Sequence, residues 1–130
     1  MVHVLSSRTL IRPTDPERSR AFYGERLRLP VYREFGTGVE RGTVYFLGGG
    51  FLELSGRSEA PHSAGVRLWL QVEDLAAAHA ELRGAGVDIV RPPVREPWGL
   101  IEMWIADPDG IPLVLVEVPA EHPLRHRPGI

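Results

Sequence analysis

The sequence predicts an α+β fold in which two βαβββ modules form one curved mixed sheet around a concave cavity, with the helices on the convex face. The chain has 130 residues, which suits a single domain. Two helix start signals, at Asp15 and Asp74, lie 59 residues apart (74 minus 15). Each start follows one strand-like run and precedes three more. A repeat of this length is too long for a solenoid unit, so we interpret it as two copies of one module.

The first predicted helix begins at Thr14–Glu17, where an N-cap, a proline in the first turn and a capping-box glutamate follow one another. Its helical spacing continues until Pro30 stops the segment. Gly48–Gly50 predicts a hairpin between the last two strands of this half. The strand-like runs are residues 7–12, 31–35, 43–47 and 51–54.

The second predicted helix begins at Glu73–Leu75 and is closed by Gly84 and Gly86. The run before it, 66–72, alternates apolar with polar or aromatic residues, which is typical of a strand with one buried face. Asp107–Gly110 predicts the turn before the last strand. The strand-like runs of this half are residues 66–72, 87–90, 101–105 and 112–118.

The same patterns set the domain boundaries within one domain that spans residues 1–130. Module 1 covers about residues 5–56, a linker 57–64, module 2 about 65–118 and a C-terminal tail 119–130. Pro123 and Pro128 disfavour a helix in the tail. We therefore interpret the tail as loose or as a dimer arm.

The composition excludes several classes of function. The net charge of −2 gives no electrostatic reason to expect nucleic acid or an anionic membrane as a partner. The absence of cysteine removes thiol nucleophiles, disulfides and cysteine-based zinc sites. No apolar run approaches the roughly 20 residues of a membrane span, and the N-terminus does not read as a secretory signal. We therefore expect a soluble, cytoplasmic protein.

An ordered set of segments resembles the vicinal-oxygen-chelate superfamily of glyoxalases, bleomycin-resistance proteins and dioxygenases. The segments are 15–23 (DPERSRAFY) with 27–29 (LRL), 72–82 (VEDLAAAHAEL) with 86–87 (GV), and 97–99 (PWG) with 107–110 (DPDG). The resemblance runs from about Arg8 to Glu117 and implies the fold given above. Arg28 stands where the family usually has glycine, so we expect this loop to take another path.

The resemblance also implies where a divalent metal ion would be held. The four ligand positions of the family fall here on Arg8, Glu53, Arg67 and Val114. Only Glu53 could ligate a metal, because arginine stays cationic and valine has no donor atom. A catalytic site needs about three protein ligands. We therefore expect no metal and no other cofactor, with one divalent metal ion as the alternative.

The side chains that line the predicted cavity follow from strand alternation. Arg67 and Trp69 point away from the buried face of their strand, and Arg8 does the same in module 1. Glu53 comes in from the neighbouring strand, while Glu102 and Trp104 share one face of the seventh strand. The hypothesis is that Arg8 and Arg67 clamp an anionic group and that Trp69 and Trp104 stack on the ligand. The alternative is that both arginines only pair with Glu53 as an internal ion network.

Three functions stay open on this evidence. The first is metal-independent binding of a small, acidic or aromatic organic molecule. The second is a lyase, isomerase or dioxygenase of the same superfamily, with Glu53 or Glu102 as a general base or with a divalent metal. The third is a vestigial site in a partner module. The resemblance also implies a homodimer.

Overall fold

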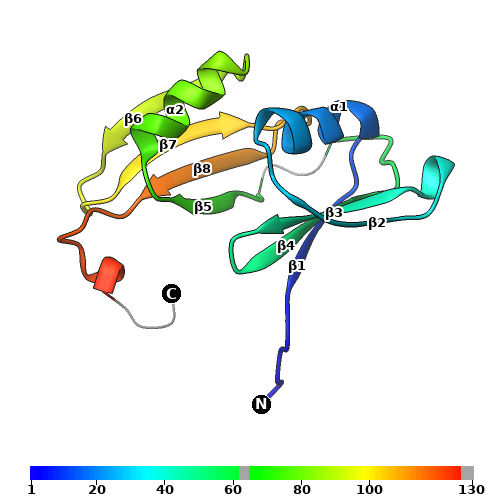
Figure 1. Ribbon diagram of the computed structural model, residues 1–130, viewed down its shortest axis with the longest axis horizontal. Coiled ribbons are helices and arrows are strands. Elements are labelled where there is room, and N and C mark those ends of the chain that lie inside the picture. The colour runs from blue at the N-terminus through cyan, green and yellow to red at the C-terminus, as the bar shows by residue number, and fades with distance from the viewer. Residues whose placement is uncertain (62–64, 127–130) are drawn as a thin grey trace. The chain divides into compact units, whose positions relative to one another are not determined.

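The computed structural model describes residues 1–61 and 65–126; 62–64 of the predicted linker and 127–130 of the predicted tail lie outside the described residues. The chain divides into two compact units, Met1–His62 and Ser63–Ile130 (Figure 1). Each unit carries one four-stranded mixed sheet and one principal helical segment in the order strand, helix, three strands. The α+β class and the two βαβββ modules are confirmed, and the closure of one cavity stays a prediction.

Module 1 forms a sheet in the order β1-β4-β3-β2, with β1 parallel to β4 and the other pairs antiparallel. The turn between β3 and β4 is the predicted glycine hairpin, in which Leu47 pairs with Gly50 and Gly48 has a φ of 56°. The elements are β1 (Arg8–Ile11), α1 (Pro16–Arg20), η1 (Ala21–Arg26), β2 (Val31–Phe35), η2 (Gly38–Glu40), β3 (Gly42–Leu47) and β4 (Gly50–Ser55).

The helical segment of module 1 changes its winding after five residues. Asp15 caps α1 by accepting a hydrogen bond from the Arg18 backbone N–H at 3.2 Å. The chain then widens into the π-helix η1, in which the Leu27 N–H donates to the Phe22 carbonyl five residues back. The wider turn accommodates two adjacent aromatic residues, Phe22 and Tyr23, which are both buried with their rings edge to face.

Arg28 bears on the expectation for the loop after η1, whose path relative to the family stays a prediction. Arg28 itself adopts the left-handed backbone conformation that glycine favours, with a φ of 59°. Hydrogen bonds fix the turn on both sides, since Leu27 and Leu29 donate to the carbonyls of Phe22 and Tyr23. The arginine therefore accepts a backbone cost of about 1 kcal/mol.

Module 2 forms a sheet in the order β5-β8-β7-β6, again with one parallel pair, β5 with β8. The helix α2 is capped by Asp74 and packs against β6, β7 and β8, burying Leu75 and Leu82 (Figure 1). The elements are β5 (Leu68–Val72), α2 (Leu75–Gly84), β6 (Ile89–Arg95), β7 (Ile101–Ala106), β8 (Pro112–Glu117) and η3 (Pro123–His126). No helix among the described residues is long and apolar enough to cross a membrane.

The strand register of module 2 separates its two sheet faces. One face packs under α2 and includes Leu113 and Met103, which have no exposed surface. On the other face, Val114 pairs with Trp69 of β5 and with Trp104 of β7. In the next row, Val116 pairs with Gln71 and Glu102. The prediction that Glu102 and Trp104 share one face is thus confirmed, and that face also carries Trp69.

The described part of the tail, 119–126, is attached to its own module rather than loose. Pro123 begins the short 3-10 helix η3 instead of preventing all helical structure. Leu124 packs against a cluster of apolar side chains formed by Leu100, Val116 and Val118. The segment therefore lies on the face opposite α2.

Candidate functional site

An ion pair lies on the face of the module 1 sheet that the alternation of β1 exposes. Leu10 is 63% exposed and its neighbour Ile11 only 4%, so Arg8 and Leu10 share the open face. The parallel register places Glu53 beside Leu10. Arg8 Nη1 donates to Glu53 Oε1 at 2.8 Å. The structure thus brings together Arg8 and Glu53, two of the residues expected in the site.

Glu53 has a second hydrogen-bond donor that the sequence did not reveal. Ser55, two residues along β4 and on the same face, donates its hydroxyl to Glu53 Oε2 at 2.7 Å. This hydrogen bond is the largest cause that lowers the pKa of Glu53 below its ordinary value; Arg8 adds to the effect and burial opposes it. A carboxylate with a lowered pKa is a weak general base at neutral pH.

An aromatic cluster adjoins the ion pair on module 1. The rings of Tyr32, Phe46 and Phe51 lie with centroids 4.9 to 5.7 Å apart. Tyr32 is 50% exposed and Phe46 43% exposed, while the Arg8 guanidinium lies 5.8 Å from the centroid of the Phe51 ring. Sequence reasoning missed this cluster. The sequence did contain a signal for it. Strand alternation from Glu53 places Phe51 on the same face of the hairpin, together with its cross-strand partner Phe46.

On module 2, the structure does not bring the expected site residues Arg67 and Trp69 together in the way that it brings together Arg8 and Glu53. Arg67 is exposed and precedes β5, which begins two residues later than the predicted strand. Trp69 is 51% exposed on the open face. Val114 lies beside it, against the apolar cluster described above. Trp69 therefore presents an indole for contact, whereas Arg67 lies outside the strand.

Trp104 and Glu102 have partners within module 2 that sequence reasoning missed. The Arg91 guanidinium lies 3.6 Å from the centroid of the Trp104 ring and also pairs with Glu96. Glu102 is only 8% exposed and accepts a hydrogen bond from Trp98 Nε1 at 2.9 Å. One face of the Trp104 indole is therefore already covered by a cation of the same chain. The bulges between β6 and β7 place Arg91 opposite Trp104, and no pattern in the sequence indicates these bulges.

The family's metal ion does not fit the residues found at its four positions. Glu53 has a hydrogen-bond donor on each carboxylate oxygen, and Arg8, one of those donors, is itself one of the four positions. Arg67 and Val114 offer no lone pair for a metal. Across residues 1–61 and 65–126, no group of three or more histidine, aspartate or glutamate side chains is placed to hold a metal ion. The chemistry of this donor set disfavours a divalent ion.

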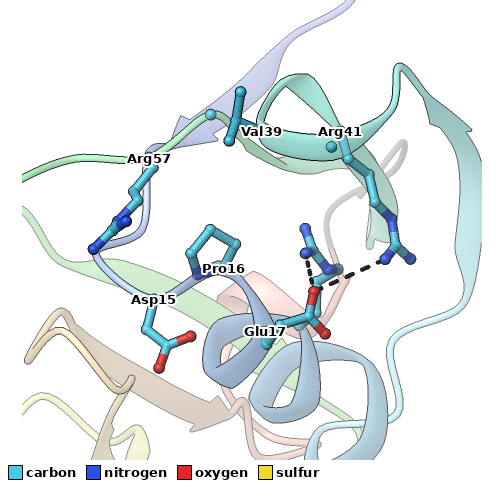
Figure 2. Close-up of a pocket in the computed structure, with 9 residues that line it drawn as sticks. Asp15, Pro16, Glu17, Val39, Arg41 and Arg57 are labelled. Atoms are coloured by element: carbon cyan, nitrogen blue, oxygen red, sulfur yellow. Dashed lines mark hydrogen bonds and ion pairs between the residues drawn. The ribbon is translucent and has the colours of Figure 1, made fainter.

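A cavity of about 470 Å³ opens elsewhere on module 1, between the start of α1 and the loop that carries η2 (Figure 2). Three of its charged side chains, Glu17, Arg20 and Arg41, belong to one ion-pair network. Glu17 Oε1 accepts a hydrogen bond from Arg20 at 2.5 Å and lies 4.0 Å from Arg41 Nη1, and Arg41 also donates to Glu34 at 2.9 Å. The Arg20 hydrogen bond is the main cause of the lowered pKa of Glu17. We interpret this network as a link between α1 and the loop.

The fold and the site define a protein built from two βαβββ modules, with a charged and aromatic sheet face. The family model of the Glyoxalase/Bleomycin resistance protein/Dioxygenase superfamily matches residues 2–115. The chain therefore belongs to this superfamily. No sequence among curated proteins matches it significantly.

Solved structures show the same fold. A member of the superfamily from Sphaerobacter thermophilus DSM 20745 is 25% identical, with a TM-score of 0.68 over 90% of this chain and 98% of that chain. A glyoxalase/bleomycin resistance protein/dioxygenase from Nocardioides is 16% identical, with a TM-score of 0.75 over 100% of this chain and 91% of the other. A lactoylglutathione lyase from Agrobacterium tumefaciens is also 16% identical, with a TM-score of 0.65 over 85% and 90%. At 16% identity the similarity concerns the fold alone.

Proposed function

We propose that the chain binds a small organic acid with an aromatic or apolar body, without a metal ion, on the sheet face that carries Arg8 and Glu53. The observation that supports this most is a guanidinium placed between a carboxylate and an aromatic cluster. Arg8 has five N–H donors and uses one in its 2.8 Å bond to Glu53, and its side chain is 36% exposed. Its remaining donors can bind a ligand carboxylate while Tyr32 and Phe46 contact the ligand body.

The open face of module 2 belongs to the proposal through its tryptophans. Trp69 is half exposed and can stack on a flat ligand. Trp104 contributes only through the face that Arg91 leaves free. Arg67, exposed just before β5, is a candidate cation for an acidic group on module 2. Glu102 serves to position Trp98.

The alternative, a metal-dependent lyase, isomerase or dioxygenase, has less support from the side chains present. The donor set at the four family positions holds one carboxylate, and that carboxylate is engaged by Arg8 and Ser55. The same two contacts lower the pKa of Glu53 and weaken it as a base. Binding without turnover is the function that this geometry supports best.

Isothermal titration calorimetry with benzoate, indole-3-acetate and benzylammonium tests the proposal. We expect the two acids to bind and the cation not to bind. Arg8→Ala should weaken binding of the acids about tenfold or more, because it removes charge-assisted hydrogen bonds. Arg83→Ala is the matched control, since it removes an equal charge from an exposed position at the end of α2. Binding of benzylammonium alone, or equal losses in both variants, would overturn the proposal.

A further inference from the structure

The C-terminal segment of module 2 covers part of the open sheet face. This segment, residues 119–126, is named the C-terminal strap here. Leu124 packs against Leu100, Val116 and Val118, with Val114 beside them. The register places Val114 and Val116 in the rows that contain Trp69 and Glu102. The strap therefore lies over the side of the sheet that α2 leaves uncovered.

His122 joins the strap to the turn between β6 and β7. Its Nε2 lies 3.3 Å from the carbonyl oxygen of Trp98, and a Cβ added to Gly99 would lie 3.2 Å from its ring atom Cδ2. Its Nδ1 accepts a hydrogen bond from the Leu124 backbone N–H at 3.2 Å. A carbonyl oxygen only accepts and a backbone N–H only donates, so this pair of partners requires a neutral imidazole with its proton on Nε2.

Protonation of His122 would disrupt one of these two contacts. An imidazolium carries N–H groups on both nitrogens, so Nδ1–H would face the N–H of Leu124. The hydrogen bond that places Leu124 would be lost, while Nε2–H could still donate to Trp98. Histidine is the side chain whose charge ordinarily changes between about pH 5 and 8.

The charged groups near His122 come from β6, β7 and the strap itself. Arg95 of β6 donates to the Gly99 carbonyl at 3.4 Å and lies 3.8 Å from the carboxylate of Glu121 in the strap. Glu102 of β7 bonds to the Trp98 indole, on the residue whose carbonyl faces His122.

We propose that the C-terminal strap is a pH-sensitive cover of the open face of module 2 and that His122 is its latch. The strap is closed while the His122 imidazole is neutral and opens when the imidazole is protonated. Opening uncovers the apolar cluster next to Val114 and the row that contains Glu102. The consequence for ligands rests on the proposed function, whereas the opening itself does not.

Amide hydrogen exchange of the full chain without ligand, measured by NMR at pH 8 and pH 5.5, tests the latch. Rates are divided by the intrinsic rate at each pH. We expect protection of the Leu124 amide to fall about fivefold at pH 5.5, as expected for the loss of one hydrogen bond. The Ala85 amide of module 2, which donates to the Glu81 carbonyl, should stay unchanged.

Two variants distinguish protonation of His122 from a general loss of stability at low pH. His122→Asn keeps a side-chain acceptor for the N–H two residues ahead but does not titrate, so its Leu124 protection should be equal at both pH values. His122→Ala should show low protection at both. Unchanged protection in the parent protein, or an equal fall in the Asn variant, would overturn the proposal.

A ligand measurement then distinguishes this proposal from the previous one. If the open face binds indole-3-acetate, His122→Ala should bind it more tightly than the parent at pH 8. If no variant binds the acid but Leu124 protection still falls with pH, the proposed function fails and the latch stands.

Discussion

Each carboxylate oxygen of Glu53 has its own donor, Arg8 on Oε1 and Ser55 on Oε2. The side chain is about one-tenth exposed, so both contacts act where water screens little. This arrangement fixes the carboxylate and keeps it ionised. Glu53, the one residue of the four family positions with a metal-ligating group, is thereby engaged by Arg8 and Ser55.

The pH dependence of stability follows from the lowered pKa of Glu53. A carboxyl whose pKa is lower in the folded protein stabilises the fold above its unfolded pKa, and this contribution is lost as the pH falls through the folded value. Ser55→Ala removes the largest cause of the shift. We expect the pKa of Glu53 to rise, and the free energy of unfolding at pH 7 to fall by about 1 to 2 kcal/mol.

Carboxyl-carbon NMR titration and urea unfolding between pH 3 and pH 7 measure both effects. The stability of Ser55→Ala should decrease less on acidification than that of the parent. Ser58→Ala is the control, because its hydroxyl bonds to the Ala60 carbonyl and not to Glu53. An unchanged Glu53 titration in Ser55→Ala would contradict the assignment.

At the scale of elements, the β2–β3 pair depends on a glycine covered by an aromatic ring. Gly42 pairs with Phe35 across the strands, and a Cβ at this position would lie 2.2 Å from the Phe35 ring. Arg33 in turn lies 5.6 Å from the centroid of that ring. The Phe35 ring of β2 therefore packs directly on the backbone of Gly42 in β3, where any side chain would displace it.

Gly42→Ala should destabilise the protein by about 1 to 3 kcal/mol, because the Phe35 ring must leave its place. Gly49→Ala is the matched control, since nothing lies within 4 Å of a Cβ built there and its backbone is not left-handed. Thermal or urea unfolding measures both variants. Equal stability of the two variants would show that the ring moves without cost.

The elements also show which part of the fold the sequence predicts well. The strand 31–35 has the predicted bounds, and both helices begin at their aspartate caps, because capping and alternation are local signals. Sequence reasoning missed the π-helix, which depends on packing around Phe22 and Tyr23, and the aromatic cluster, which the alternation of the β3–β4 hairpin could have indicated. Sequence reasoning also missed the contact of Arg91 with the Trp104 ring. The bulges of β6 decide which of its side chains faces β7, and strand alternation does not predict bulges.

At the scale of the whole molecule, the family's four metal positions contribute two arginines, one valine and one engaged glutamate. We expect protein incubated with Zn²⁺, Ni²⁺, Mn²⁺ or Fe²⁺ and then desalted to retain no stoichiometric metal, because one carboxylate cannot hold a divalent ion tightly. Inductively coupled plasma mass spectrometry measures this. One tightly held ion per chain would mean that other residues supply the ligands and would favour the enzymatic alternative.

The homodimer and the cytoplasmic location stay predictions.

The aromatic residues are divided between the modules in a way that serves spectroscopy. All three tyrosines, Tyr23, Tyr32 and Tyr45, lie in module 1, and all three tryptophans, Trp69, Trp98 and Trp104, lie in module 2. Light at the red edge of the absorption band excites tryptophan alone, so its emission follows the second half of the chain. Tyrosine emission follows the first. One unlabelled sample therefore carries two separate optical reporters, and comparing their melting curves tells whether the duplicated halves unfold together or one after the other.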